Sequence, residues 1–230
     1  MNRILITGAS RGIGRATANK LADKGRTLFL QGRDEAALKR VAEEVERRGA
    51  SATVLAADLS DTRAIERMVD SVGEESVDVL INNAGLAIVK PVDQITIEEW
   101  QESLAVNVTA PFLLSQRLLS NMSEGAAIVN LLSIAASNGF PTWSSYCATK
   151  FALDGFSRAL REELRSRGIR VITVSPSATN TELWDSVSGD FARERMLDPG
   201  EVAEAIAFAL SRPSSVLVDT INVGNIAGTL

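Results

Sequence analysis

The chain has 230 residues, of which 45% are hydrophobic and 23% charged, and it carries a formal net charge of −5. This composition is typical of a soluble folded protein; it excludes an intrinsically disordered chain and lacks the basic excess of a nucleic-acid or membrane-surface binder. The chain has no histidine and one cysteine, Cys147, which excludes Ser-His-Asp and Cys-His catalysis, histidine-ligated zinc and an intrachain disulfide. Because no apolar run approaches a membrane span and no signal peptide is evident, we expect a cytoplasmic protein without a metal site.

Short apolar runs alternate with helical patterns along the whole chain. Most of these runs are continuous, which favours strands buried on both faces of a parallel sheet. The predicted strands are Ile4–Thr7, Thr27–Leu30, Ala52–Leu55, Val77–Asn82, Ala127–Leu132 and Arg170–Val174, with a weaker pair at Val216–Val218 and Ile221–Val223. The alternation predicts a single α/β domain over residues 1–230, a Rossmann-like doubly wound parallel sheet of about seven strands with helices on both faces.

Capping signals mark where several helices begin and end. Asp34, Asp198 and the pair Thr96 and Glu99 precede helical patterns, and Gly168 follows one. Helices are accordingly expected over Trp100–Leu119, Ser144–Arg167 and Val202–Leu210.

The segment from Ser175 to Asp198 has no clear helix or strand pattern and carries Trp184 and Phe191. Long loops in compact domains are usually functional. We therefore expect residues 179–198 to form a lid over a substrate.

A glycine-rich turn joins the first predicted strand to a helix. Glycines at such a turn allow close approach of a pyrophosphate to the backbone, and the helix N-terminus supplies amide donors. The turn is not a Walker A loop, because no Lys-Ser/Thr pair follows its last glycine. The cofactor-binding residues predicted here are Gly8, Ser10, Arg11, Gly12, Ile13 and Gly14.

The end of the second predicted strand indicates which nicotinamide cofactor is bound. An acid that would hold a ribose 2′-hydroxyl is missing, and Arg33 stands 19 residues after Gly14. Together with Arg11, this guanidinium suits a 2′-phosphate, so we expect NADPH to be preferred over NADH. The alternative is that Arg33 only pairs with Asp34 or Glu35 in solvent.

Tyr146 and Lys150 are four residues apart in a predicted helix, so both side chains lie on one face. A nearby ammonium favours a phenolate, which is how a chain without histidine could hold a general acid/base. Ser133 follows a buried strand, at the sheet edge where ligands bind in open α/β sheets. Alone, the Tyr-Lys spacing is equally compatible with a surface pair.

With these motifs together, the sequence resembles the short-chain dehydrogenase/reductase family over essentially its whole length. The glycine turn matches the family's TGxxxGxG motif, Asn82 to Gly85 match its NNAG motif, and Asn107, Ser133, Tyr146 and Lys150 match its catalytic tetrad. The resemblance implies further cofactor contacts at Asp58, Leu59, Asn83, Ala84, Gly85, Tyr146, Lys150, Pro176, Thr179 and Thr181. Ser177 departs from the family, which often has glycine there.

The resemblance also implies a role for each member of the tetrad. Tyr146 would give a proton to a substrate carbonyl, and Ser133 would orient the carbonyl oxygen. Lys150 would bind the nicotinamide ribose and lower the pKa of Tyr146, and Asn107 would hold a water linking Lys150 to solvent. Family members assemble through their long helices, here about 98–121 and 144–167, which implies a homodimer or homotetramer.

The expected function is NADPH-dependent, reversible reduction of a ketone or aldehyde. Several apolar residues are candidates for a pocket suited to an uncharged, hydrophobic small-molecule carbonyl substrate: Leu86, Ile88, Phe140, Pro141, Trp143, Leu183, Trp184 and Met196. Two alternatives stay open: a non-catalytic NADP-binding regulatory or scaffold protein, and an epimerase or dehydratase without net redox change. Neither nucleic acid nor a membrane is expected as a partner.

Overall fold

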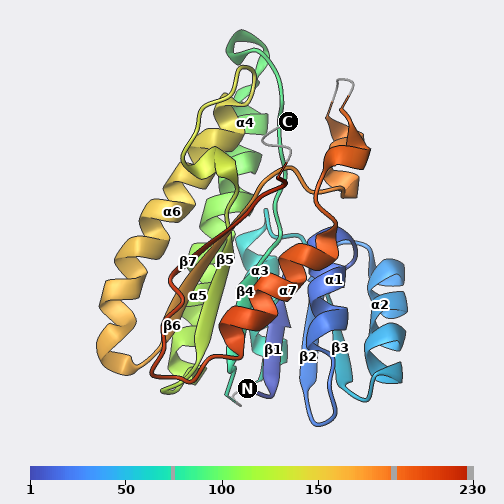
Figure 1. The fold of residues 1–230 in the computed structure, drawn as a ribbon, viewed down its shortest axis with the longest axis vertical. Coiled ribbons are helices and arrows are strands. Elements are labelled where there is room, and N and C mark those ends of the chain that lie inside the picture. Colours follow the sequence, from blue (N-terminus) through green and yellow to red (C-terminus); the bar gives the residue numbers. More distant parts are fainter. Residues whose placement is uncertain (74–75, 188–190, 227–230) are drawn as a thin grey trace.

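The computed structural model describes residues 1–73, 76–187 and 191–226. Its centre is one parallel seven-stranded sheet with the strand order β3-β2-β1-β4-β5-β6-β7 (Figure 1). The strands are β1 Arg3–Ile6, β2 Thr27–Gly32, β3 Ser51–Ala56, β4 Val79–Asn82, β5 Ala127–Leu131, β6 Arg170–Pro176 and β7 Thr220–Val223. The reversal of strand order between β1 and β4 is the Rossmann arrangement, so the predicted fold class is confirmed.

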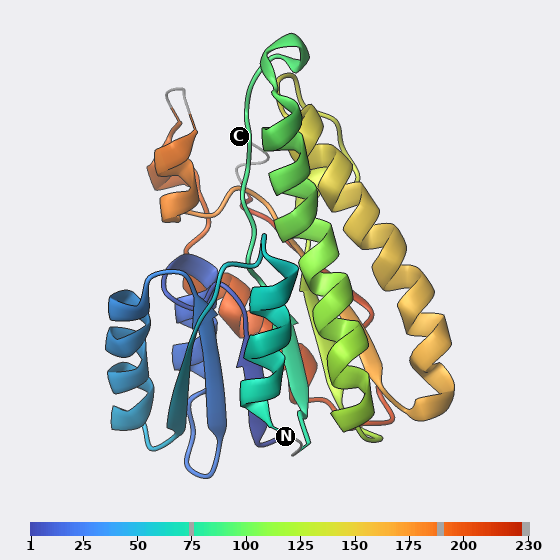
Figure 2. The same cartoon turned by 180° about the vertical axis from the view of Figure 1, so that it is seen from behind.

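Helices cover both faces of the sheet. One face carries α1 (Gly12–Leu21), α2 (Glu35–Arg47) and α7 (Pro199–Leu210), and α1 packs closely on α7. Figure 2, seen from behind, shows the helices of the other face: α3 (Thr62–Val72), α4 (Ile97–Leu104), α5 (Ala110–Leu118) and α6 (Ser144–Leu164).

Two hydrophobic cores separate these layers from the sheet. Along β1, Ile4 and Ile6 pack toward α1, α2 and α7, whereas Leu5 packs toward α3, α5 and α6. All three side chains are almost completely buried. Successive side chains of a strand point to opposite faces, so a strand covered on both sides has to be apolar at every position. This is why continuous apolar runs predicted the strands.

The predicted helix starts have the expected caps. The Asp34 carboxylate accepts a hydrogen bond from the Ala37 amide at 2.9 Å, and Asp198 accepts one from the Gly200 amide at 2.7 Å. Thr96 and Glu99 form a reciprocal capping box at the start of α4. Each cap satisfies an amide that the first helical turn leaves without a partner.

Two predicted elements differ in the structure. Val216–Val218 is not a strand: it lies in an irregular, largely exposed stretch between α7 and β7, and only Thr220–Val223 pairs with β6. The single helix predicted over Trp100–Leu119 is interrupted by a π-helical turn at Ala105–Thr109. Pro111 lies just after this turn and has no amide to donate to the carbonyl four residues earlier, at Asn107.

The loops that carry the predicted site residues follow the carboxyl ends of the parallel strands, so they lie at the same edge of the sheet. The segment after β6 contains two short 3₁₀ helices, Glu182–Ser186 and Arg193–Arg195, and a β-bridge joins Thr179 to Leu197. Residues 188–190 of the predicted lid lie outside the described residues. Within the described part of the chain, no helix is both long and apolar enough to cross a membrane.

Candidate active site

A cavity of about 580 Å³ opens at the carboxyl edge of the sheet. It brings together residues that are far apart in the sequence, from the glycine turn after β1 to the segment after β6. Ser133 lines this cavity, and so do all the predicted cofactor contacts except Gly14. These contacts are Gly8, Ser10, Arg11, Gly12, Ile13, Arg33, Asp58, Leu59, Asn83, Ala84, Gly85, Tyr146, Lys150, Pro176, Thr179 and Thr181.

The glycines of the turn are required by its geometry. Gly8 and Gly12 have φ values of 63° and 54°, in the left-handed region that side chains disfavour. Gly14 does not line the cavity but lies beneath the turn, where a Cβ would stand 2.1 Å from the Gly8 carbonyl oxygen. Gly14 therefore allows α1 to start directly against the turn, which leaves the cavity side of the turn open.

Gln31, whose role the sequence did not reveal, supports this turn from the end of β2. Its side-chain oxygen accepts a hydrogen bond from the Gly8 amide at 3.1 Å, and its side-chain nitrogen donates to the Ala57 carbonyl at 2.8 Å. The buried amide thus connects the turn after β1 to the end of β3. A polar residue inside an otherwise apolar strand is the only sequence signal that could have pointed to it.

The end of β2 presents a cation and no acid to the cavity. Arg33 is exposed and lines the cavity, and Gly32 precedes it, where a Cβ would lie 3.4 Å from the Ser10 hydroxyl oxygen. The alternative pairing of Arg33 with Asp34 or Glu35 is not seen among the described residues, because Asp34 caps α2 and Glu35 pairs with Lys39. In the described part of the chain no ion pair engages the Arg33 guanidinium, which is thus available to a ligand.

Asp58 lies on the same side of the cavity as Arg33. Hydrogen bonds from the Ser60 amide and hydroxyl hold the pKa of the Asp58 carboxyl below its ordinary value, and the charge of Arg33 acts in the same direction. Asp58 is consequently an acceptor at neutral pH.

Ser133, Tyr146 and Lys150 meet in the other half of the cavity. Ser133 lies two residues after the end of β5, and its side chain forms a hydrogen bond with Tyr146. Tyr146 and Lys150 share one face of α6, with the Lys150 ammonium 5.5 Å from the centre of the tyrosine ring. Lys150 is only 4% exposed and donates a hydrogen bond to the Leu131 carbonyl at 2.7 Å. The predicted juxtaposition of these three side chains is thus present.

Burial has the largest effect on the pKa values of Tyr146 and Lys150. Burial raises the pKa of Tyr146 to about 12, although the hydrogen bond with Ser133 acts in the opposite direction. Burial also lowers the pKa of Lys150 to about 8, which still leaves the lysine mostly charged at neutral pH. Loss of solvation is thus the largest influence on the pKa of Tyr146 in the protein without cofactor, and the lowering of this pKa by Lys150 stays a prediction.

Asn107 lies behind the cavity wall, within the π-helical turn. Its side-chain nitrogen donates to the Leu86 carbonyl and the Thr149 hydroxyl, and its side-chain oxygen accepts from the Leu86 amide. A Cβ on Gly85 would lie 3.4 Å from this oxygen and 3.8 Å from the Lys150 nitrogen. The missing side chain of Gly85 thus leaves a space that both polar groups border.

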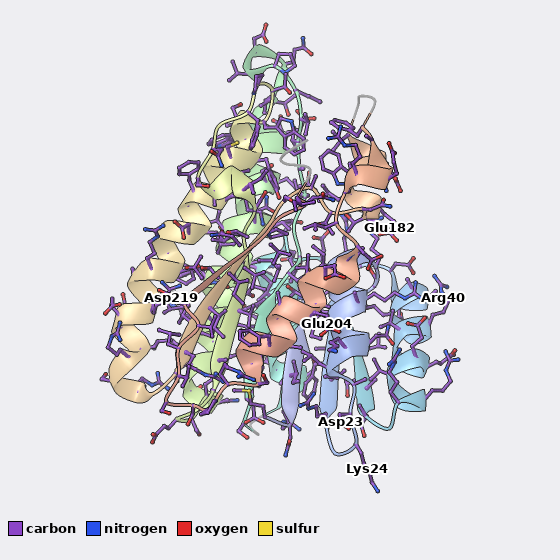
Figure 3. The ribbon with its side chains drawn as sticks, viewed as in Figure 1. Asp23, Lys24, Arg40, Glu182, Glu204 and Asp219 are labelled. Atoms are coloured by element: carbon purple, nitrogen blue, oxygen red, sulfur yellow. The ribbon has the colours of Figure 1, made fainter. Side chains whose placement is uncertain are left out.

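The segment after β6 covers the glycine turn. A Cβ on Gly12 would lie 3.0 Å from the Thr181 methyl carbon and 3.6 Å from a carboxylate oxygen of Glu182, which Figure 3 labels beside α1. Ser177, where the family often has glycine, does not adopt a positive φ, so a side chain is tolerated there.

Most of the apolar residues predicted for a substrate pocket line this cavity. Leu86, Ile88, Phe140, Trp143, Leu183 and Trp184 do so, whereas Pro141 and Met196 do not. The cavity is also lined by Phe191, Glu102 and Val106. Met196 is a buried core residue. Cys147 is buried in α6, as expected for a packing residue.

The strand order, with a glycine turn opening α1 against the sheet edge, defines a dinucleotide-binding protein of the Rossmann type. The predicted tyrosine, lysine and serine share the cavity with this glycine turn.

Comparisons with known proteins agree. Residues 2–190 match the family model described as short chain dehydrogenase, and the chain belongs to this family of NAD(P)-dependent oxidoreductases. A D-threitol dehydrogenase from Mycolicibacterium smegmatis is 32% identical, with 93% of this chain and 87% of that protein covered. A Burkholderia cenocepacia short chain dehydrogenase in complex with NADP has 31% identity and a TM-score of 0.89, covering 97% and 96%. The landomycin C-6 ketoreductase LanV, with bound NADP and rabelomycin, has 29% identity and a TM-score of 0.86, covering 99% and 97%.

Proposed function

We propose that this protein reduces a ketone or aldehyde to an alcohol with NADPH, reversibly, with Tyr146 as the general acid/base. The observation that carries the proposal is the meeting of Ser133, Tyr146 and Lys150 in the same cavity as the glycine turn. Solved relatives that bind NADP, one of them named a ketoreductase, support the same reading.

The residues present fit a nicotinamide dinucleotide phosphate. The turn at Gly8 and Gly12 needs glycine because both φ values are positive and a Cβ would crowd Ala84 or Thr181, and α1 begins there with its amide donors. Arg33 and Arg11 would bind the 2′-phosphate, since a guanidinium can form paired hydrogen bonds with phosphate oxygens. Asp58 and the residues from Asn83 to Gly85 would bind the adenine side and the central part of the cofactor.

Bound NADPH supplies a hydride, which forms the new C–H bond at the carbonyl carbon. As the carbonyl π bond breaks, Tyr146 donates its proton to the oxygen and forms the O–H bond of the alcohol. Ser133 donates a hydrogen bond that orients the same oxygen, and Lys150 binds the nicotinamide ribose. A raised pKa keeps Tyr146 protonated at neutral pH, which suits a proton donor in the direction of reduction.

Asn107 is proposed to position water rather than to touch the substrate. Its side-chain oxygen and the Lys150 ammonium border the same space beside Gly85, where a water would connect them. Such a water would return a proton to Tyr146 through Lys150 after each turnover.

The remaining parts of the proposal rest on the sequence and the family. We expect one domain over residues 1–230, with residues 179–198 as a substrate lid, and a homodimer or homotetramer. The cytoplasmic location of the protein remains a prediction. A non-catalytic NADP-binding protein is the main alternative, and the presence of both Tyr146 and Lys150 in one cavity supports the catalytic proposal over it.

The test is cofactor oxidation by the purified protein, with NADPH and then NADH, against a panel of ketones and aldehydes. Tyr146→Phe should lower kcat/KM by about 100-fold or more, the usual contribution of a general acid, while NADPH still binds. Turnover that survives in Tyr146→Phe would rule out the assigned acid. NADPH binding without turnover of any carbonyl would favour the non-catalytic alternative.

A further inference from the structure

Aromatic side chains form a continuous wall that begins at the catalytic tyrosine. The ring centres of Tyr146 and Trp143 are 5.5 Å apart, those of Trp143 and Trp184 are 5.7 Å apart, and those of Trp184 and Phe191 are 4.6 Å apart. The Tyr146 and Trp143 rings meet edge to face at 70°, an arrangement that aromatic pairs favour, and the other two pairs are tilted at 60° and 55°. Trp143, Trp184 and Phe191 all line the cavity. A substrate whose carbonyl meets Tyr146 would therefore lie along these rings.

This aromatic wall is held in place before any ligand binds. The Trp184 indole nitrogen donates a hydrogen bond to the Thr179 carbonyl at 2.9 Å, which fixes the ring on the segment after β6. Trp143 follows Thr142, whose φ of 69° is in the left-handed region that a β-branched residue strongly disfavours. Thr142 is held there by the Lys90 amide, which donates to its carbonyl at 2.9 Å. Strain of this kind persists where surrounding structure enforces it, commonly at ligand sites.

Charges along the cavity disfavour an anionic substrate at this wall. Among the described residues, the cations that line the cavity are Arg11, Arg33 and Lys150. Arg11 and Arg33 belong to the glycine turn and the end of β2, and Lys150 donates to the Leu131 carbonyl. The other charged lining residues, Glu102 among them, are acids. A carboxylate or sulfonate beside the rings would lose its hydration without gaining a counter-ion.

A polyol would fit this wall poorly as well. The side-chain nitrogen of Trp184 is engaged by the Thr179 carbonyl, and the side chains of the lining residues Ile88, Val106 and Phe140 have no polar group. Hydroxyl groups placed there would lose hydrogen bonds to water without replacement. An aromatic ring, in contrast, would add edge-to-face contacts to those already present.

We propose that the substrate of this site is an uncharged aromatic ketone or aldehyde, whose ring packs on Trp143 and Trp184 while its carbonyl meets Tyr146. This inference rests on the proposed reductase function and adds the chemical class of its substrate. It predicts that the enzyme selects substrates by the aromaticity of their ring and by their charge, whereas a pocket that is only hydrophobic would not distinguish an aromatic from an aliphatic ring.

Three ketones test it: phenylacetone, cyclohexylacetone and 4-carboxyphenylacetone. In each, a methylene separates the ring from the carbonyl, so the ring is not conjugated with the reacting group. We expect kcat/KM for phenylacetone to exceed that for cyclohexylacetone by about tenfold, the effect of one or two aromatic contacts, and to exceed the carboxylate by more. Binding of the same ketones to the NADP⁺-loaded protein, measured by calorimetry, should follow the same order.

Trp184→Leu should bring the ratio between the two neutral ketones close to one, whereas Trp100→Leu should leave it unchanged. Trp100 is the matched control because it lies on α4 and does not line the cavity. Equal kcat/KM values for the two neutral ketones, a ratio that Trp184→Leu does not change, or efficient turnover of the carboxylate would each overturn the inference while leaving the reductase function intact. Ring-selective binding without turnover of any ketone would support the aromatic site and contradict the reductase function.

Discussion

The pKa of the Tyr146 hydroxyl can be measured directly, and it is raised by burial and lowered by the hydrogen bond with Ser133. It is the only tyrosine of the chain, so tyrosinate absorbance reports on this group alone. Burial raises its pKa to about 12, above the ordinary value of about 10. At about pH 10, where free tyrosine is half ionised, the folded protein without cofactor should show almost no tyrosinate.

The measurement is an absorbance titration with circular dichroism recorded in parallel to show that the protein is still folded. Ionisation centred below about pH 10 in the folded, cofactor-free protein would mean that the Lys150 charge prevails over burial after all. Tyr146→Phe provides the blank, because it removes the titrating group.

Arg33 is the residue on which the choice of cofactor is expected to depend. Arg33→Ala should weaken NADPH binding by about 10- to 100-fold, since a hydrogen bond to a charged group contributes about 1.5–3 kcal/mol, and should leave NADH binding nearly unchanged. Arg40→Ala is the matched control: Arg40 is exposed on α2, points away from the cavity in Figure 3 and does not line it. The two variants are compared by titration of both cofactors. Equal losses for NADPH and NADH would contradict recognition of the 2′-phosphate by Arg33.

How far single residues could be predicted depended on whether their role is local. Tyr146, Lys150 and Ser133 could be assigned because helix spacing and strand ends place them without knowledge of the rest of the fold. Gln31 could not, because its partners at Gly8 and Ala57 are distant in the sequence. The raised pKa of Tyr146 could not either, since burial is a property of the folded chain.

At the scale of elements, α1 and α6 each contain a glycine, one in a crowded position and one in an open position. Gly14 in α1 has the Gly8 carbonyl where a Cβ would stand, whereas Gly155 in α6 has no atom within 4 Å of that position. Gly14→Ala should weaken NADPH binding by about 10- to 100-fold, because overpacking costs about 1–3 kcal/mol and moves the glycine turn. Gly155→Ala should stabilise the fold by about 0.5–1 kcal/mol, because alanine is the better helix residue.

Cofactor titration and denaturant unfolding measure both effects. Normal NADPH affinity in Gly14→Ala would show that α1 can shift without disturbing the turn. Since Gly14 does not line the cavity, such a result would also remove it from the binding residues.

Elements were predictable where a local pattern alone decides them. Strands covered on both faces are continuously apolar, and helix caps are read within four residues, so β1, β2, β4, β5, β6 and the starts of α2, α4 and α7 could be placed, whereas β3 is a largely exposed edge strand. The segment Val216–Val218 is equally apolar but remains outside the sheet, because pairing with β6 begins only at Thr220. The π-helical turn around Asn107 depends on tertiary contacts with Leu86 and Thr149, which no local pattern contains.

For the whole molecule, the exposed phenylalanines point to assembly. Phe112 on α5 and Phe151 on α6 are 43% and 49% exposed, and these helices lie side by side on one face in Figure 2. Large exposed apolar residues on adjacent helices mark an interaction surface. We expect a dimer through α5 and α6, and the double substitution Phe112→Asp and Phe151→Asp should convert it to monomers by placing charges in the interface.

Analytical ultracentrifugation measures the mass. Phe208→Asp is the control, since Phe208 is 53% exposed but lies on α7, on the opposite face of the sheet. A monomeric wild-type protein, or a double variant that keeps its assembly state, would contradict an interface at α5 and α6.

The most direct test of the account is the fate of the transferred hydrogen. NADPH carrying deuterium at C4 of the nicotinamide, on one face and then on the other, is mixed with the protein and a ketone that it turns over. Deuterium from one face only should appear on the carbinol carbon of the alcohol, with one label per product molecule. Alcohol formed without the label, or with label from both faces, would contradict direct hydride transfer in the cavity that Ser133, Tyr146 and Lys150 share with the glycine turn.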